Sequence, residues 1–155
     1  MELMNEERKM EMLNNYLVEN EQYEATMWGT IMADSKVIIG ITAGMNALGL
    51  PGSGAVGALS NQYCYIGVSE NYISFCCISN MDPSVMTGGF VMAFRDIVSA
   101  KVKKGIFGKK VLLLKTTDGN MKLSLAGNTL GSNLSKEKQI NGIEYLVHRL
   151  EALNN

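Results

Sequence analysis

The sequence predicts an α+β domain in which a meandering antiparallel sheet lies between an N-terminal and a C-terminal helix. Residues 95–125 alternate between apolar and polar side chains and are interrupted at Gly105–Gly108 and at Asp118-Gly119, which predicts three antiparallel strands. Residues 63–78 predict a further hairpin around Ser69-Glu70-Asn71. Both ends of the chain carry apolar residues at three- and four-residue steps, the period of an amphipathic helix.

The first predicted element is a helix over residues 1–20, in which Met10, Leu13 and Leu17 fall on one face. Glutamates early in this segment favour the first turns, because carboxylates interact favourably with a helix N-terminus. We expect this helix to pack on the sheet or on a neighbouring subunit. Residues 21–155 are then expected to form a single domain, which begins with a strand over residues 23–33.

Residues 37–62 are predicted to be an insertion rich in Gly and Ala, without a single charged side chain. The stretch 37–59 is long enough to span a membrane as a helix, but Asn46, Pro51 and Gly52-Ser53-Gly54 make a poor helix. We therefore expect a buried loop or a subunit contact, and the alternative is a loop that touches a membrane. Gly52–Gly57 also spells G-x-G-x-x-G, but no strand leads directly into it and no helix has room to follow, so a dinucleotide site is not expected.

The strands after this insertion are bounded by turn residues. Strands are expected at residues 63–68 and 72–78, followed by a loop over residues 80–89 with Pro83 and Gly88-Gly89 as breakers, and a strand from Gly89 to Phe94. Within residues 95–125, Val98, Ala100 and Val102 are expected to share one face, and Asp118-Gly119 is expected to form a turn in which both residues have positive φ.

The last predicted element is a C-terminal helix that carries an apolar stripe from Ile140 to Leu153. Ser132, Asn133 or Ser135 is expected to cap its N-terminus. Gly142 weakens the middle of this helix by about 1 kcal/mol relative to alanine, so packing must stabilise it. Its apolar stripe is expected to consist of Ile140, Ile143, Val147, Leu150 and Leu153.

Two passages resemble the bacterial pleckstrin-homology-like (PH-like) families, which are similar to GRAM domains. They are the hairpin at Tyr65–Phe75 and the segment from Phe94 to Gly108 with the following Leu114–Gly119 hairpin. The resemblance covers roughly residues 23–153. It implies a bent sheet or partly open barrel of about seven strands with a C-terminal helix, so the N-terminal helix is an addition. It also implies roles in binding and scaffolding.

The charge is unevenly distributed along this 155-residue chain, although its net charge is only −1. Residues 1–34 contain eight acidic and two basic side chains, whereas residues 95–122 contain eight basic and two acidic ones. The two regions are expected to lie near each other or to pair between subunits. The bulk charge itself does not indicate nucleic-acid binding.

Catalytic and metal-binding patterns are missing from the sequence, so no enzyme activity, metal or cofactor is expected. Cys64, Cys76 and Cys77 do not have the spacing of a disulfide framework, and they are interpreted as small core residues in a reducing, cytoplasmic compartment. His148 is the only histidine, and it is expected to be solvated or to cap a helix. Ser53 lies in no nucleophile elbow.

A cluster of lysines around two apolar residues is the one concentrated candidate for binding. The leading expectation is a non-enzymatic scaffold or interaction domain that binds an unknown protein partner or forms homo-oligomers. The alternative is a peripheral membrane protein whose lysines contact anionic lipids. Nucleic acid is not expected, because no aromatic stacking platform accompanies the lysines. The candidate contact residues are Lys101, Lys103, Lys104, Ile106, Phe107, Lys109 and Lys110.

Overall fold

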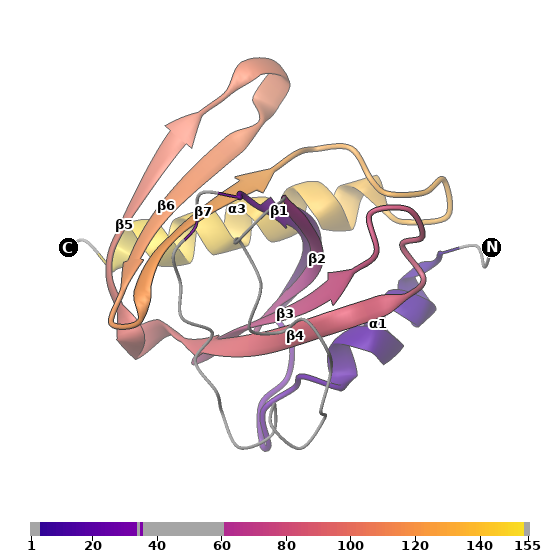
Figure 1. Cartoon of the computed structure of the whole chain (residues 1–155), viewed down its shortest axis with the longest axis horizontal. Coiled ribbons are helices and arrows are strands. Elements are labelled where there is room, and N and C mark those ends of the chain that lie inside the picture. The colour runs from indigo at the N-terminus through magenta and orange to yellow at the C-terminus, as the bar shows by residue number, and fades with distance from the viewer. Residues whose placement is uncertain (1–3, 34, 36–60, 154–155) are drawn as a thin grey trace.

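The computed structural model describes residues 4–33, 35 and 61–153. It has the α+β architecture expected from the sequence, with seven strands between an N-terminal and a C-terminal helix (Figure 1). In chain order the elements are α1 (Glu6–Asn14), β1 (Ala25–Ile31), β2 (Gln62–Val68), β3 (Tyr72–Ile78), β4 (Met86–Ala93), β5 (Ile97–Lys104), β6 (Lys110–Thr116), β7 (Gly119–Leu125) and α3 (Lys136–Ala152). Short 3-10 turns cover Phe94–Asp96 and Ile106–Gly108.

The strands form one antiparallel sheet in the order β4-β3-β2-β1-β7-β6-β5, which is not closed into a barrel. β1 joins the two halves, and it pairs with β2 along its whole length. Its pairing with β7 is restricted to Thr30 with Ser124 and Ile31 with Leu123. Upstream of Thr30, β7 therefore leaves one edge of β1 without a neighbouring strand.

The helices lie on opposite sides of the β2–β4 half of the sheet (Figure 1). On one side, Ile143, Leu146 and Leu150 of α3 pack into the main core, which includes stacked Phe75 and Phe90. On the other side, residues of α1 cover a second apolar cluster. Because both faces are covered, the strands β2 and β3 are buried almost throughout. Cys76 and Cys77 accordingly face opposite clusters, and all three cysteines are buried as predicted.

The N-terminal helix is shorter than predicted and uses a different face. It spans Glu6–Asn14, with Asn5 as its N-cap, and its packed face contains Lys9, Met12 and Leu13, while Tyr16 is buried just after the helix. Met10 and Leu17 are only half-buried, so the predicted Met10–Leu13–Leu17 stripe was wrong. The helix packs on its own sheet, which is one of the two placements expected.

The strand β4 begins at Met86, earlier than predicted. The prediction ended the preceding loop at Gly88-Gly89, but both glycines lie inside the strand. Gly88 and Gly89 pair with Cys77 and Cys76 of β3. A Cβ on Gly89 would overlap with the ring of Tyr16, which packs directly on the strand. This glycine therefore admits an aromatic ring and does not end the strand.

Two local details of residues 95–125 differ from the prediction. The register of β5 shifts between Ile97 and Ser99, so Val98 is 64% exposed while Ile97 and Ala100 are buried. The β6–β7 hairpin forms where expected, but Thr116 pairs with Gly119, and only Gly119 has positive φ there. The three strands are thus confirmed, and the expected Asp-Gly turn conformation is wrong.

The C-terminal helix begins after Ser135, whose side chain accepts a hydrogen bond from the N–H of Lys138 (3.1 Å). Of the three predicted N-caps, Ser135 is the one that caps the helix. Its buried stripe is shifted from the predicted one, because Ile140 is 39% exposed and Leu153 is also exposed. The buried residues are Gln139, Gly142, Ile143, Leu146 and Leu150.

The helix α1 in the acidic region and the β5–β6 hairpin tip in the basic region lie at opposite ends of the molecule. Figure 1 shows the β5–β6 hairpin projecting at the upper left, whereas α1 lies at the lower right. Among the described residues, the two regions meet where the end of β1 adjoins β7, with the N–H of Met32 donating to the carbonyl of Lys122 (2.9 Å), so the expectation that they lie near each other holds for this contact and not for α1 and the hairpin tip. The insertion at residues 37–62 falls, up to residue 60, outside the described residues. Within the described ranges, the structure contains no helix that is both long and apolar enough to cross a membrane.

Candidate functional site

The predicted lysine cluster forms the outer end of the β5–β6 hairpin. Lys104 pairs directly with Lys110 across the two strands, and the N–H of Gly105 donates to the carbonyl of Lys109 (2.6 Å). The turn between them is a 3-10 turn that ends at Gly108, with φ +77°. Ile106 lies in this turn with 75% of its surface exposed. The tip thus presents an apolar residue between cationic strand ends.

The lysines occupy both faces of this hairpin. Since successive strand residues point to opposite faces, Lys101 and Lys103 share one face and Lys104 lies on the other with Lys110. All are exposed except Lys110, which is half-buried, and Lys109 is exposed beside the turn. The structure therefore brings together the predicted contact residues, apart from Phe107, whose side chain lies outside the described part.

Like charges stand directly opposite each other at this tip, which lowers the stability of a sheet. Residues 97–116 contain six lysines and no acidic residue, so the hairpin supplies no counter-charge of its own. Ile106 adds exposed apolar surface at the apex. Neither feature stabilises the fold, and together they form a surface suited to an anionic and partly apolar contact.

The acidic N-terminal region is largely engaged within the chain. Glu6 contacts the buried Lys9 (2.7 Å) and accepts a hydrogen bond from the N–H of Ser135 (2.8 Å). Burial opposes ionisation of Glu6, but these partners hold its pKa below the ordinary value. Burial lowers the pKa of Lys9, and contact with Glu6 counteracts this effect. Glu11 pairs with Arg8 (3.3 Å).

Glu21 is likewise held by the chain, at the turn between β2 and β3. Its carboxylate accepts hydrogen bonds from the N–H of Asn71 (3.0 Å), the hydroxyl of Ser69 (2.8 Å) and the side-chain amide of Asn71 (3.1 Å). The Asn71 N–H is the main cause of the lowered pKa of Glu21. A protein carboxylate therefore occupies the donors of this turn.

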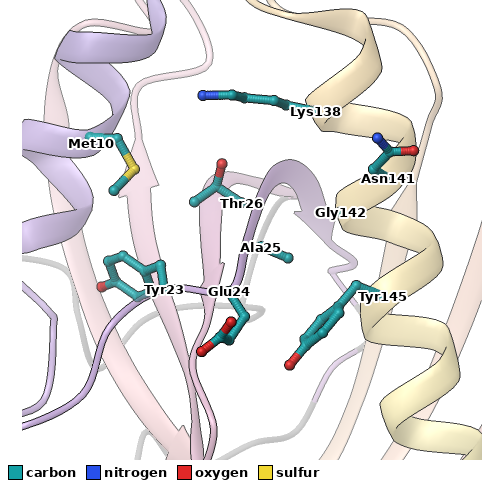
Figure 2. A pocket seen from close by; sticks show the side chains of 9 residues that line it. All are labelled: Met10, Tyr23, Glu24, Ala25, Thr26, Lys138, Asn141, Gly142 and Tyr145. Atoms are coloured by element: carbon teal, nitrogen blue, oxygen red, sulfur yellow. The ribbon is translucent and has the colours of Figure 1, made fainter.

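A pocket of about 420 Å³ lies where α1, the start of β1 and α3 come together (Figure 2). Its lining includes Tyr23 and Glu24 just before β1, Thr26 within β1, and Lys138, Asn141 and Tyr145 from α3. Sequence reasoning missed these residues. They lie in two segments more than a hundred residues apart, and neither segment contains a motif by itself.

No described part of the chain contains a group of three or more His, Cys, Asp or Glu side chains that could hold a metal ion. His148 is exposed on α3. Cys64 and Cys77 lie opposite each other on β2 and β3 with their sulfurs 3.5 Å apart. Burial raises the pKa of Cys64 and raises that of Cys76 to about 12, so both remain protonated thiols near neutral pH.

Comparison with known proteins adds no functional assignment to these observations. The chain matches no family model, and neither the curated proteins nor the solved structures give a significant match.

Proposed function

We propose that this protein is a non-enzymatic binding domain of PH-like type, which attaches to an anionic membrane surface through the tip of its β5–β6 hairpin. The observation that carries the proposal is the direct pairing of Lys104 with Lys110 beside exposed Ile106. Two opposed ammonium groups without an acidic neighbour on the hairpin destabilise it, unless an external anion lies between or above them. The resemblance to PH-like domains supports a role in binding.

The lysines lie on both faces of the hairpin, which favours a flat membrane surface at its tip over a protein partner bound to one face. A protein surface lying flat on the hairpin would meet either Lys101 and Lys103 or Lys104 and Lys110, which lie on opposite faces. A bilayer that receives Ile106 brings both faces to the level of the headgroups. Each lysine close to such a surface contributes about 1 kcal/mol.

A second copy of the chain is less well supported as the anionic partner. Self-assembly was expected to pair the acidic N-terminal region with the lysines. Glu6, Glu11 and Glu21 are engaged within the chain, so among the described acids of this region Glu7, Glu19 and Glu24 are exposed without an ion pair. An acidic protein partner remains the alternative occupant of the hairpin.

Vesicle co-sedimentation tests the proposal directly. The protein is incubated with vesicles of phosphatidylcholine alone and with vesicles that also contain phosphatidylglycerol, at low and high salt. We expect binding only to the anionic vesicles and weaker binding at high salt. The double variant K104Q/K110Q and the variant I106S are expected to bind less.

The matched control is K115Q/K136Q, which removes the same charge from exposed positions away from the tip. It is expected to bind nearly as well as the unmodified protein. Absence from anionic vesicles at both salt concentrations would overturn the membrane proposal. Equal binding by the tip and control variants would overturn the assignment of the tip.

A further inference from the structure

The pocket between α1, β1 and α3 carries a second inference, independent of the hairpin. We propose that it binds a small zwitterion whose cationic and anionic groups are separated by several bonds, such as an ω-amino acid. Its volume of about 420 Å³ is within the range of small-molecule sites. The class of ligand follows from the positions of its charged, aromatic and backbone groups.

Opposite charges lie at the two ends of this pocket. Lys138 is in the first turn of α3, whereas Glu24 lies at the other end, near Tyr145 (Figure 2). Lys138 and Tyr145 are seven residues apart, which corresponds to about 10 Å along a helix. Lys138 approaches Glu6 only at 4.0 Å, and among the described residues Glu24 forms no ion pair. Glu24 is thus available to a ligand, and Lys138, whose side chain is largely exposed, forms only a long ion pair that a ligand carboxylate can replace or share.

Two tyrosines flank the acidic end. The rings of Tyr23 and Tyr145 lie on either side of Glu24 in Figure 2. Tyr23 is fixed because its hydroxyl donates to the carbonyl of Leu13 (2.5 Å), and Tyr145 accepts a hydrogen bond from Arg149 (3.3 Å). Aromatic faces beside a carboxylate favour an ammonium group. The cationic end of the ligand is therefore assigned to this side.

The pocket exists because β7 separates from β1. Backbone groups of Thr30 face β7, and those of Trp28 face the same side and are bound by Gln139 of α3. Strand residues two apart direct their backbone groups to the same side, so the N–H of Thr26 also points toward this unpaired edge. Gly142 packs against the carbonyl of Thr26, so α3 closes part of the edge and leaves the pocket beside it.

Charge separation determines which zwitterions fit. In an α-amino acid the two charged groups share one carbon, so the molecule cannot reach both Glu24 and Lys138. A longer ω-amino acid places its ammonium between the tyrosines and its carboxylate at Lys138. Asn141 lines the wall between these ends and offers an amide to the carboxylate side.

The test uses the full chain and a series of zwitterions of increasing length: glycine, 4-aminobutanoate, 6-aminohexanoate and 8-aminooctanoate. Binding is measured by NMR chemical-shift titration and by calorimetry. We expect no binding of glycine and an optimum at an intermediate length. E24Q and K138M are each expected to weaken binding of the best ligand about tenfold or more, because each removes one charged partner.

The matched controls are E144Q and K136M, which make the same changes at exposed α3 positions outside the pocket. Both are expected to bind as the unmodified protein does. The proposal is overturned if no member of the series binds, if glycine binds as well as the longer ligands, or if E24Q and K138M bind like their controls. NMR spectra of all variants distinguish lost binding from lost folding.

Discussion

The side-chain amide of Gln139 takes the place of a neighbouring strand for Trp28. Its oxygen accepts from the N–H of Trp28 (2.9 Å), and its nitrogen donates to the carbonyls of Trp28 (3.1 Å) and Ala126 (2.8 Å). One helical residue thus joins β1 to the end of β7, at a point where the two strands no longer pair. Gln139 is buried, so these bonds replace water that cannot reach the site.

We predict that Gln139→Leu lowers the free energy of unfolding by about 3 kcal/mol. The substitution leaves one N–H and two carbonyl groups without their partner, and each unsatisfied buried group costs about 1–3 kcal/mol. Urea unfolding measures the effect. Asn141→Leu, at an exposed position two residues further along α3, is the control and should change stability by less than about 0.5 kcal/mol. Equal effects of the two substitutions would contradict the role of Gln139.

Gly142→Ala is predicted to be destabilising, although alanine is the better helix former by about 1 kcal/mol. A Cβ at this position would overlap with the backbone carbonyl of Thr26, which cannot rotate away as a side chain can. The helix α3 would have to move off β1. Thermal unfolding is expected to show a lower Tm.

The control for added bulk is Gly127→Ala, because a Cβ there meets no atom within 4 Å. It is expected to leave the Tm nearly unchanged. A rise in Tm for Gly142→Ala would show that helix propensity outweighs the close contact.

The hydrogen bonds to Glu21 predict a pH dependence of stability. Its pKa is lowered in the folded state, chiefly by the N–H of Asn71, so the ionised carboxylate stabilises the fold. This stabilisation is complete above the pKa of glutamate in the unfolded chain and is lost as pH falls through the lowered folded pKa. Urea unfolding of the wild type and Glu21→Gln across acidic pH should show a difference that shrinks on acidification. Glu19→Gln, at an exposed residue, is expected to show no such trend.

The buried thiols are predicted to resist alkylation in the folded protein. Burial raises the pKa of Cys76 to about 12 and raises the pKa of Cys64 as well, so little thiolate is present at mildly alkaline pH. Mass spectrometry after iodoacetamide treatment should show unmodified native protein and complete modification in urea. Rapid labelling of the native protein would mean that β2 and β3 open readily.

Removing the opposed lysines of the hairpin is predicted to preserve or slightly raise stability. K104Q/K110Q relieves a like-charge pair, and cross-strand pairs are worth roughly 0.2–1 kcal/mol. The gain should be larger at low salt, where the repulsion is less screened. Urea unfolding at two salt concentrations checks this. A clear loss of stability would mean that these lysines are structural.

Much of the fold could be predicted because it depends on local sequence patterns. Strand alternation, the turn at Ser69–Asn71 and the cap at Ser135 all depend on neighbours within a few residues. Predictions failed where a distant residue changed the local rule. From the sequence alone Gly89 is interpreted as a strand breaker, because the ring of Tyr16 that packs on it is distant in the chain. Val98 is likewise interpreted as a core residue, because the register shift in β5 is visible only in the structure.

The two candidate sites differ in the same way. The lysine cluster could be predicted because its residues are nearly consecutive, although their division between two faces required the register of β5 and β6. The pocket could not be predicted, because Glu24 and Lys138 line the same cavity only when α3 crosses β1.

The sequence by itself determined the α+β class, the three strands within residues 95–125, the burial of the cysteines and the position of the basic turn. These properties follow from side-chain periodicity and hydrophobicity, which act locally. Tertiary structure decided that α1 and the lysine-bearing hairpin tip lie at opposite ends, that Glu6 and Glu21 are engaged internally, and that a pocket opens beside β1. Each of these depends on contacts between segments far apart in the chain, and such contacts are selected by packing of the whole core.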